Sequence, residues 1–171
     1  MHKLRDPPGD IEEDLTRRLD ALSGNGKVYV LGLGNTDRAD DGAGILVAEA
    51  LKKRFPSFSF SEHDGVEGTV LDISERDEDA TIIFVDAGNI GEAPGTIALV
   101  PKDRIKETEI TTHRVAVALM ASILEKAGKR SAVLCIQPER IQFRGEVTAK
   151  VKASVKTLTR ILTELMARID R

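Results

Sequence analysis

Short apolar runs that alternate with segments of helical spacing are the feature that most constrains the fold. These runs occupy residues 27–34 (KVYVLGLG), 80–88 (ATIIFVDAG), 95–100 (GTIALV) and 131–137 (SAVLCIQ). Most carry apolar residues on both faces, which is typical of strands buried in a parallel sheet. Strands that alternate with helices predict an α/β fold: a three-layer sandwich with a mostly parallel, twisted sheet and helices on both faces.

The segments between the runs have the spacing of helices. The last segment, 147–169, shows the pattern most clearly, because apolar residues recur along one face, namely Val151, Val155, Leu158, Leu162 and Leu165. The other predicted helices are 10–22, 41–54, 68–77 and 112–128. Residues 58–63 (FSFSEH) alternate and predict a more exposed strand.

Length and composition are those of an ordinary globular protein. The 171 residues, of which 41% are apolar, predict a single domain over 1–171. Residues 1–9 are expected to be frayed, since Pro7, Pro8 and Gly9 interrupt regular structure. The formal net charge of −3 gives no indication of nucleic-acid binding, and no apolar run is long enough for membrane insertion.

Cysteine usage bears on the compartment. Cys135 is the one cysteine, so no disulfide can form within the chain and a cytoplasmic location is expected. The apolar neighbours of Cys135 favour an inert, buried side chain over a nucleophile.

A loop rich in glycine and aspartate, GLGNTDRADDGAG at residues 32–44, follows the first predicted strand. Glycines between a strand and a helix are typical of phosphate-binding loops. Here Asp37 stands where the third glycine of the GxGxxG pattern belongs, and Asp40 and Asp41 follow at the helix start. Carboxylates at that place oppose a pyrophosphate, so a cation is favoured and nucleotide binding is the weaker alternative.

Asp40 and Asp41 have two interpretations. An aspartate near a first helical turn caps the helix by accepting backbone N–H groups. A second, adjacent aspartate is more than capping requires, and neighbouring side chains point in different directions. We therefore expect one of the two to cap the helix and the other to face a cleft. The glycines at 32, 34, 42 and 44 are expected to let a substrate approach the backbone closely.

Asp86 and His113 complete a candidate metal site. Asp86 ends a buried strand, where a carboxylate either pins the next loop through backbone N–H groups or binds a cation. His113 lies near the start of a predicted helix and is either a solvent-facing histidine or a ligand. Two carboxylates and one imidazole suit zinc, nickel or a similar ion and leave coordination positions open. His63 is predicted to lie on the surface.

Four blocks of the chain, in this order, resemble the hydrogenase maturation proteases: VLGLGNTDRADDGAGILVAEAL, VDAGNIGEAPGT, TTH and IQPERIQFRGEVTAKV. They cover most of the sequence from about Lys27 onward, and the N-terminal part looks most like the archaeal HycI-type branch. The resemblance implies an endopeptidase that removes a short C-terminal peptide from the large-subunit precursor of a [NiFe] hydrogenase after nickel insertion. It also implies a sheet sandwiched between helices.

The resemblance implies roles for particular residues. The metal-contacting positions of the family fall on Asp41, Asp86 and His113. Our own hypothesis is that Asp41 or Asp86 is the catalytic carboxylate. The expected cofactor is nickel carried by the substrate, with no organic cofactor. The precursor is the expected partner, and the isolated protein is expected to be a monomer. We expect five further residues to form the substrate-binding cleft: Gly34, Asn35, Asp40, Gly42 and Gly88.

Two questions stay open at the level of sequence. Either a carboxylate acts as general base in an aspartic-type mechanism, or the metal activates the attacking water. The alternative function is a non-catalytic nickel-binding chaperone or docking factor for hydrogenase assembly, since the sequence has no Ser–His or Cys–His nucleophile signature.

Overall fold

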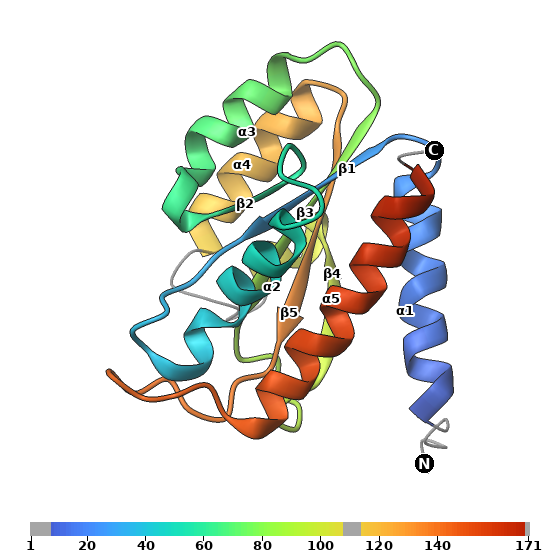
Figure 1. The fold of residues 1–171 in the computed structure, drawn as a ribbon. Coiled ribbons are helices and arrows are strands. Elements are labelled where there is room, and N and C mark those ends of the chain that lie inside the picture. The colour runs from blue at the N-terminus through green and yellow to red at the C-terminus, as the bar shows by residue number, and fades with distance from the viewer. Residues whose placement is uncertain (1–7, 108–113, 170–171) are drawn as a thin grey trace.

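The computed structural model describes residues 8–107 and 114–169 and contains a five-stranded sheet with helices on both sides (Figure 1). The strands are β1 (Lys27–Gly32), β2 (Ser59–Ser61), β3 (Ala80–Ala87), β4 (Ile97–Pro101) and β5 (Arg130–Ile136). Their order in the sheet is β2-β1-β3-β5-β4. The pairs β1–β2, β1–β3 and β3–β5 are parallel, whereas β4 runs antiparallel to β5. The prediction of a mostly parallel sheet is confirmed.

Helices cover the two faces of the sheet. One face carries α1 (Pro8–Ser23), α2 (Ala43–Lys52) and α5 (Ala149–Ile169), and the other carries α3 (Val66–Glu75) and α4 (Arg114–Lys126). Figure 1 shows α1 beside α5 at the right of the view and α3 beside α4 at the upper left. The architecture is the three-layer α/β sandwich that the alternation of strands and helices predicts.

The central strands are apolar at successive positions because they supply two cores. Val30 and Ile83 enter the core beneath α2 and α5, while Leu31 and Phe84 enter the core beneath α3 and α4. Successive side chains of a strand point to opposite faces, so a strand covered on both sides needs apolar residues throughout. All eight residues of β3 are buried accordingly.

The position of β4 differs from the prediction. The run 95–100 reads as a buried strand, but β4 forms an edge of the sheet, and four of its five residues are half-buried or exposed. The run begins with a turn in which Gly95 has φ +86°, so the strand starts only at Ile97. A short apolar run has the same pattern at an edge as in the centre, which explains the error.

Helix boundaries also differ from the prediction, by two residues in most cases. The predicted helix 41–54 is divided into a 3-10 turn, η1 (Ala39–Gly42), and α2. Pro8 begins α1 instead of fraying the chain, because the fixed φ of proline suits the first turn of a helix. The prediction for residues 1–7 falls outside the described residues. Two further 3-10 turns are η2 (Glu62–Asp64) and η3 (Lys102–Glu107).

Within residues 8–107 and 114–169, no helix is both long and apolar enough to cross a bilayer.

Candidate active site

The two aspartates predicted to be catalytic lie at the carboxyl edge of the parallel strands. β1 ends at Gly32 and leads into the loop that carries Asp41, while Asp86 is the second-last residue of the adjacent β3. The Asp86 side chain is buried, and its Oδ1 accepts the backbone N–H of Ala87 at 2.9 Å. Ligand sites of open α/β sheets form at this edge.

Gly34 lies beside both the backbone of Asp41 and the carboxylate of Asp86. It has φ +128°, and a Cβ placed on it would lie 1.9 Å from the Asp41 carbonyl oxygen and 3.7 Å from Asp86 Oδ1. Asn35 donates its N–H to the same Asp41 carbonyl at 3.1 Å. Only glycine fits this position, because the conformation is left-handed and the space is already occupied by backbone.

The loop between Gly34 and η1 is closed by its own hydrogen bonds. Arg38 N–H donates to Asn35 O at 3.2 Å, and Asp41 N–H donates to Arg38 O at 3.1 Å. The exposed Asn35 accepts the Asp37 N–H on its Oδ1 at 2.8 Å. At the end of this loop Asp41 is half-buried, whereas Asp40 is fully buried. Asp41 is therefore the member of the pair that reaches the surface.

Asp40 has a role that the sequence did not reveal. Neither η1 nor α2 has a side-chain N-cap, so the capping expectation is wrong. The Asp40 carboxylate instead crosses to the β5–α5 loop, where it accepts the backbone N–H groups of Glu139 (2.8 Å), Arg140 (3.0 Å) and Thr148 (2.7 Å). The Thr148 hydroxyl is also within 3.0 Å of both Asp40 oxygens. We call this set of contacts the Asp40 clamp.

The Asp40 clamp favours the charged carboxylate. Burial opposes ionisation, but the hydrogen bonds from Arg140, Thr148 and Glu139 outweigh it and hold the pKa of Asp40 below its usual value. Thr148 directly precedes α5 and accepts the Lys152 N–H on its carbonyl. Asp40 thus satisfies a donor at the start of α5 rather than at the start of its own helix.

Backbone strain is concentrated where these two loops meet. Among the described residues, the non-glycine residues with positive φ are Ala39 (+49°) and Arg144 (+60°). Arg144 donates its N–H to Asp37 O at 2.7 Å, and a Cβ on Gly145 would lie 3.0 Å from the Ala39 Cβ. Left-handed conformations of this kind persist only where surrounding contacts enforce them, and they cluster at functional sites.

Gly32 and Gly44 serve packing within the chain. A Cβ on Gly44 would lie 2.1 Å from Val85 O and 2.4 Å from Leu33 O. A Cβ on Gly32 would lie 2.2 Å from Gly44 O. The start of α2 therefore rests directly on the ends of β1 and β3, and the space that these two glycines leave is filled by protein backbone rather than left for a substrate.

The remaining predicted cleft residues take different positions. Gly42 is buried, and a Cβ on it would lie 3.0 Å from the Thr36 Cα. Gly88 is buried and donates its N–H to Ile136 O at 3.1 Å, so it joins the β3–β4 loop to β5. His63 is exposed on η2, as predicted.

Gln137 is a further site-supporting residue that sequence reasoning missed. It is buried just beyond the end of β5, and its Oε1 accepts the Ile90 N–H at 2.8 Å. Its backbone N–H and C=O pair with Thr96 and Gly95. These bonds fix the loop that follows Asp86. The signal in the sequence that could have identified Gln137 is a polar residue at the end of the apolar run SAVLCIQ.

Cys135 is inert, as predicted. It lies opposite Asp86 in the β3–β5 ladder and is completely buried. Burial, together with the negative charge of Asp86, raises the pKa of the Cys135 thiol to about 12. A thiol with this pKa is protonated at neutral pH and is no nucleophile.

The metal-site prediction stays a prediction. Asp41 and Asp86 both lie near Gly34, but His113 falls outside the described residues. Within residues 8–107 and 114–169 no three metal-ligating side chains come together. Of the three predicted ligands, the two described ones, Asp41 and Asp86, are carboxylates, which suit a hard or borderline cation.

Solved structures define the class of protein to which this arrangement belongs. The crystal structure of a [NiFe] hydrogenase maturation protease HycI from Thermococcus kodakarensis covers 88% of this chain and 99% of its own, with a TM-score of 0.72 at 24% identity, and so shares the fold. The solution structure of the endopeptidase HycI from Escherichia coli covers 81% of this chain and 90% of its own, with a TM-score of 0.67 at 25% identity.

Sequence comparison then gives the family. Residues 45–165 match the model of HycI, hydrogenase maturation protease. The hydrogenase 3 maturation protease of Escherichia coli K12 is 30% identical over 132 residues, which are 75% of this chain and 84% of the relative. The chain belongs to the hydrogenase maturation protease family. This membership places it among the peptidases and removes the nucleotide-binding alternative.

Proposed function

We propose that this protein is the endopeptidase that removes a short C-terminal peptide from the nickel-loaded large-subunit precursor of a [NiFe] hydrogenase. The observation that carries the proposal is that the backbone of Asp41 and the carboxylate of Asp86 both lie beside Gly34 at the carboxyl edge, in a chain of this family. One aspartate is buried and the other half-buried, so a substrate reaches the pair from the side of Asp41.

The nickel is part of the substrate in this proposal. Asp41, Asp86 and His113 contact the nickel of a loaded precursor and place the adjacent peptide bond beside the carboxylates. A precursor without nickel lacks this contact, so the metal acts as the recognition element. Carboxylate and imidazole donors suit a borderline ion such as nickel.

The attacking water is activated by one of the two carboxylates. A general base must lie within hydrogen-bond reach of the proton that it removes. Asp86 is held by the Ala87 N–H at the end of a rigid strand, while Asp41 lies on a loop whose backbone is fixed by Asn35 and Arg38. The carboxylate of Asp86 and the backbone of Asp41 are therefore positioned before the substrate arrives, which supports an aspartic-type mechanism. Polarisation of the water by the substrate's nickel is the competing route.

The setting follows from the same proposal. The protein acts in the cytoplasm, as a monomer that binds the precursor transiently. A chain whose one cysteine is buried as a protonated thiol depends on no disulfide for its fold, which supports a reducing compartment.

Intact-mass spectrometry of the precursor tests the proposal. The precursor is incubated with the protein, with and without nickel loading, and we expect loss of a C-terminal peptide only from the loaded sample. Asp41→Asn and His113→Ala are expected to abolish the mass change. Asp37→Asn is the matched control, because it removes an exposed carboxylate from the same loop.

Two outcomes contradict the proposal in different ways. An unchanged mass of a loaded, cognate precursor that still binds the protein would support the non-catalytic chaperone or docking factor. Cleavage of the nickel-free precursor at the same rate would retain the peptidase and reject nickel as the recognition element.

A further inference from the structure

The β5–α5 loop, residues 137–148, exposes two large apolar side chains that lie close together in the chain. Ile141 is 48% exposed and Phe143 is 67% exposed. The other exposed large apolar side chains of the described residues lie one to a helix, namely Ile11, Leu46, Leu71 and Leu119. Isolated exposed apolar residues are ordinary, whereas apolar residues gathered on one loop mark an interaction surface.

This loop is held rigidly although it contains no helix or strand. The Asp40 clamp holds residues 139, 140 and 148, and Asp40 N–H also donates to Arg140 O at 3.0 Å. Arg144, next to Phe143, is tied to Asp37 and keeps a left-handed backbone. A surface that is already fixed loses little conformational freedom on binding, so its contacts contribute more to affinity.

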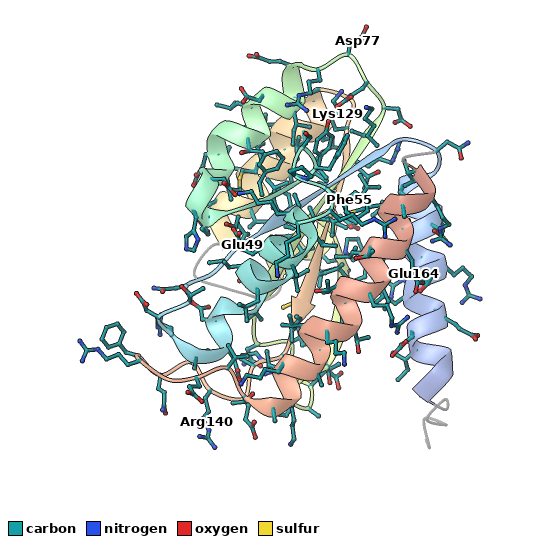
Figure 2. All side chains as sticks on the ribbon, viewed as in Figure 1. Glu49, Phe55, Asp77, Lys129, Arg140 and Glu164 are labelled. Atoms are coloured by element: carbon teal, nitrogen blue, oxygen red, sulfur yellow. The ribbon has the colours of Figure 1, made fainter. Side chains whose placement is uncertain are left out.

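The side chains on the loop are those of a protein interface. The Arg144 guanidinium lies 5.4 Å from the centre of the Phe143 ring. Figure 2 shows Arg140 at the edge of the molecule, pointing away from the body. Aromatic residues and arginine are enriched at protein–protein interfaces and among the residues that dominate their affinity. The loop projects outward beside the loop after β1 (Figure 1), a shape that suits a protein surface better than a small molecule.

We propose that Phe143 and Ile141 form a docking element for the folded body of the hydrogenase large-subunit precursor. The Asp40 clamp holds this docking element at a fixed position relative to Asp41. The inference rests on the proposed function and names the part of the enzyme that recognises the substrate outside its cleaved tail. The expected counterpart on the precursor is an apolar depression with an acidic rim, which Phe143 and Arg144 complement.

The precursor is the occupant because the loop is continuous with the site. Arg144 is hydrogen-bonded to Asp37, which lies four residues before Asp41 in the same loop. A Cβ on Gly145 would lie 3.0 Å from the Cβ of Ala39, so the backbone of Gly145 lies close to Ala39, two residues before Asp41. A substrate whose tail reaches Asp41 therefore passes close to Phe143, and its folded body covers the β5–α5 loop.

Steady-state processing of the nickel-loaded precursor by Phe143→Ser and Ile141→Ser variants tests the proposal. Both positions are exposed, so the variants are expected to fold like the wild type. We expect Phe143→Ser to raise KM about 10-fold or more and to leave kcat within about 2-fold, because loss of a docking contact weakens binding without altering the catalytic carboxylates. The matched control is Ile11→Ser, which removes an apolar side chain that is 61% exposed on α1.

Binding of each variant to immobilised precursor, measured by biolayer interferometry, separates docking from catalysis. Equal KM and equal affinity for Phe143→Ser and the wild type would overturn the docking proposal while leaving the peptidase in place. If the wild type leaves the precursor uncut, the proposed function fails, and the binding data alone decide docking. In that case, docking is supported if Phe143→Ser binds the precursor more weakly than Ile11→Ser does. It is overturned if Phe143→Ser binds as tightly as the wild type, or if the wild type does not bind the precursor.

Discussion

The two edges of the sheet use charged residues in opposite ways. At the amino edge cations donate to backbone carbonyls: the buried Lys129 donates to Arg76 O and Glu78 O. Arg130 binds Ser23 O there and pairs with Asp79. Figure 2 shows Lys129 at one end of the molecule and Arg140 at the other.

At the carboxyl edge carboxylates accept from backbone N–H groups. The main acceptors are Asp40, which joins two loops, and Asp86, the second-last residue of β3. Both described non-glycine residues with positive φ, Ala39 and Arg144, also lie at this edge. The amino edge is thus joined by cations that bind backbone carbonyls, whereas the carboxyl edge combines strained backbone with buried acidic groups, a combination that is common at functional sites.

Replacing the buried carboxylate of β3 gives the largest expected effect. Asp86→Asn keeps the shape of the side chain and an oxygen for the Ala87 N–H but removes the charge. We expect kcat/KM for precursor processing to fall roughly 10²–10⁴-fold, as for loss of a general base. The rate is measured by intact mass, and circular dichroism confirms the fold. Processing at the wild-type rate would exclude Asp86 from the chemistry.

Breaking the Asp40 clamp is expected to lower the free energy of unfolding by about 2–4 kcal/mol, because Asp40→Asn places an amide against N–H donors that prefer a carboxylate. The folded-state pKa of Asp40 is lowered, so its stabilisation is complete above the ordinary value of 3.8 and is lost as the pH falls through the lower folded-state pKa. Urea unfolding at pH 7 and at intervals from pH 4 to 2 measures both effects.

The matched variant for the clamp is Asp37→Asn, whose carboxylate is exposed in the same loop. It is expected to leave the free energy of unfolding within about 0.5 kcal/mol of the wild type. If the free energy of unfolding falls by the same amount in acid for the wild type and for Asp40→Asn, the clamp does not depend on the charge of Asp40.

The close packing of α2 on the strand ends is tested by Gly44→Ala. The new methyl group meets the carbonyl oxygens of Val85 and Leu33, and we expect the free energy of unfolding to fall by about 1–3 kcal/mol. Gly68→Ala is the control, since Gly68 lies in α3 with no atom within 4 Å of its Cβ position. That variant is expected to be more stable by about 0.5–1 kcal/mol. Thermal unfolding of both variants measures the difference in stability between them. No difference would show that Val85 and Leu33 move aside for the new methyl group.

The smallest effect is expected at the amino edge. Lys129→Met removes the donor to Arg76 O and Glu78 O while keeping an apolar stem of similar length. We expect the free energy of unfolding to fall by about 1–2 kcal/mol, with kcat and KM for the precursor unchanged. Urea unfolding and intact mass provide the two readouts. A change in kcat without a change in the fold would contradict the separation of the two edges.

The sequence predicted the layers of the fold because the physics of those layers is local. The runs around Val30 and Ile83 are apolar at successive positions, which a strand covered on both faces requires. The edge position of β4 was missed because an apolar run carries no information about which strands flank it. The inert state of Cys135 was predicted correctly from its apolar neighbours alone.

The site was predicted less completely because its main contacts join distant segments. Asp41 was proposed from the loop motif and Asp86 from its place near the end of a strand. The expectation that one of Asp40 and Asp41 caps its own helix is wrong, because the hydrogen-bond partners of Asp40 lie 99 to 108 residues further along the chain. No local pattern relates an aspartate at 40 to a threonine at 148. Gly44 was misread for the same reason, because the carbonyl that crowds it most closely belongs to β3.

The Asp40 clamp also has a consequence for the time at which the site forms. Its donors extend to Thr148, so the loop that carries Asp41 has its native partners only after most of the chain has been synthesised. Contacts of such long sequence separation close late, because a long loop must first lose its freedom. A growing chain can pair β1 with β3 well before the loops at its carboxyl edge are joined, so this edge is completed only when the segment before α5 is in place.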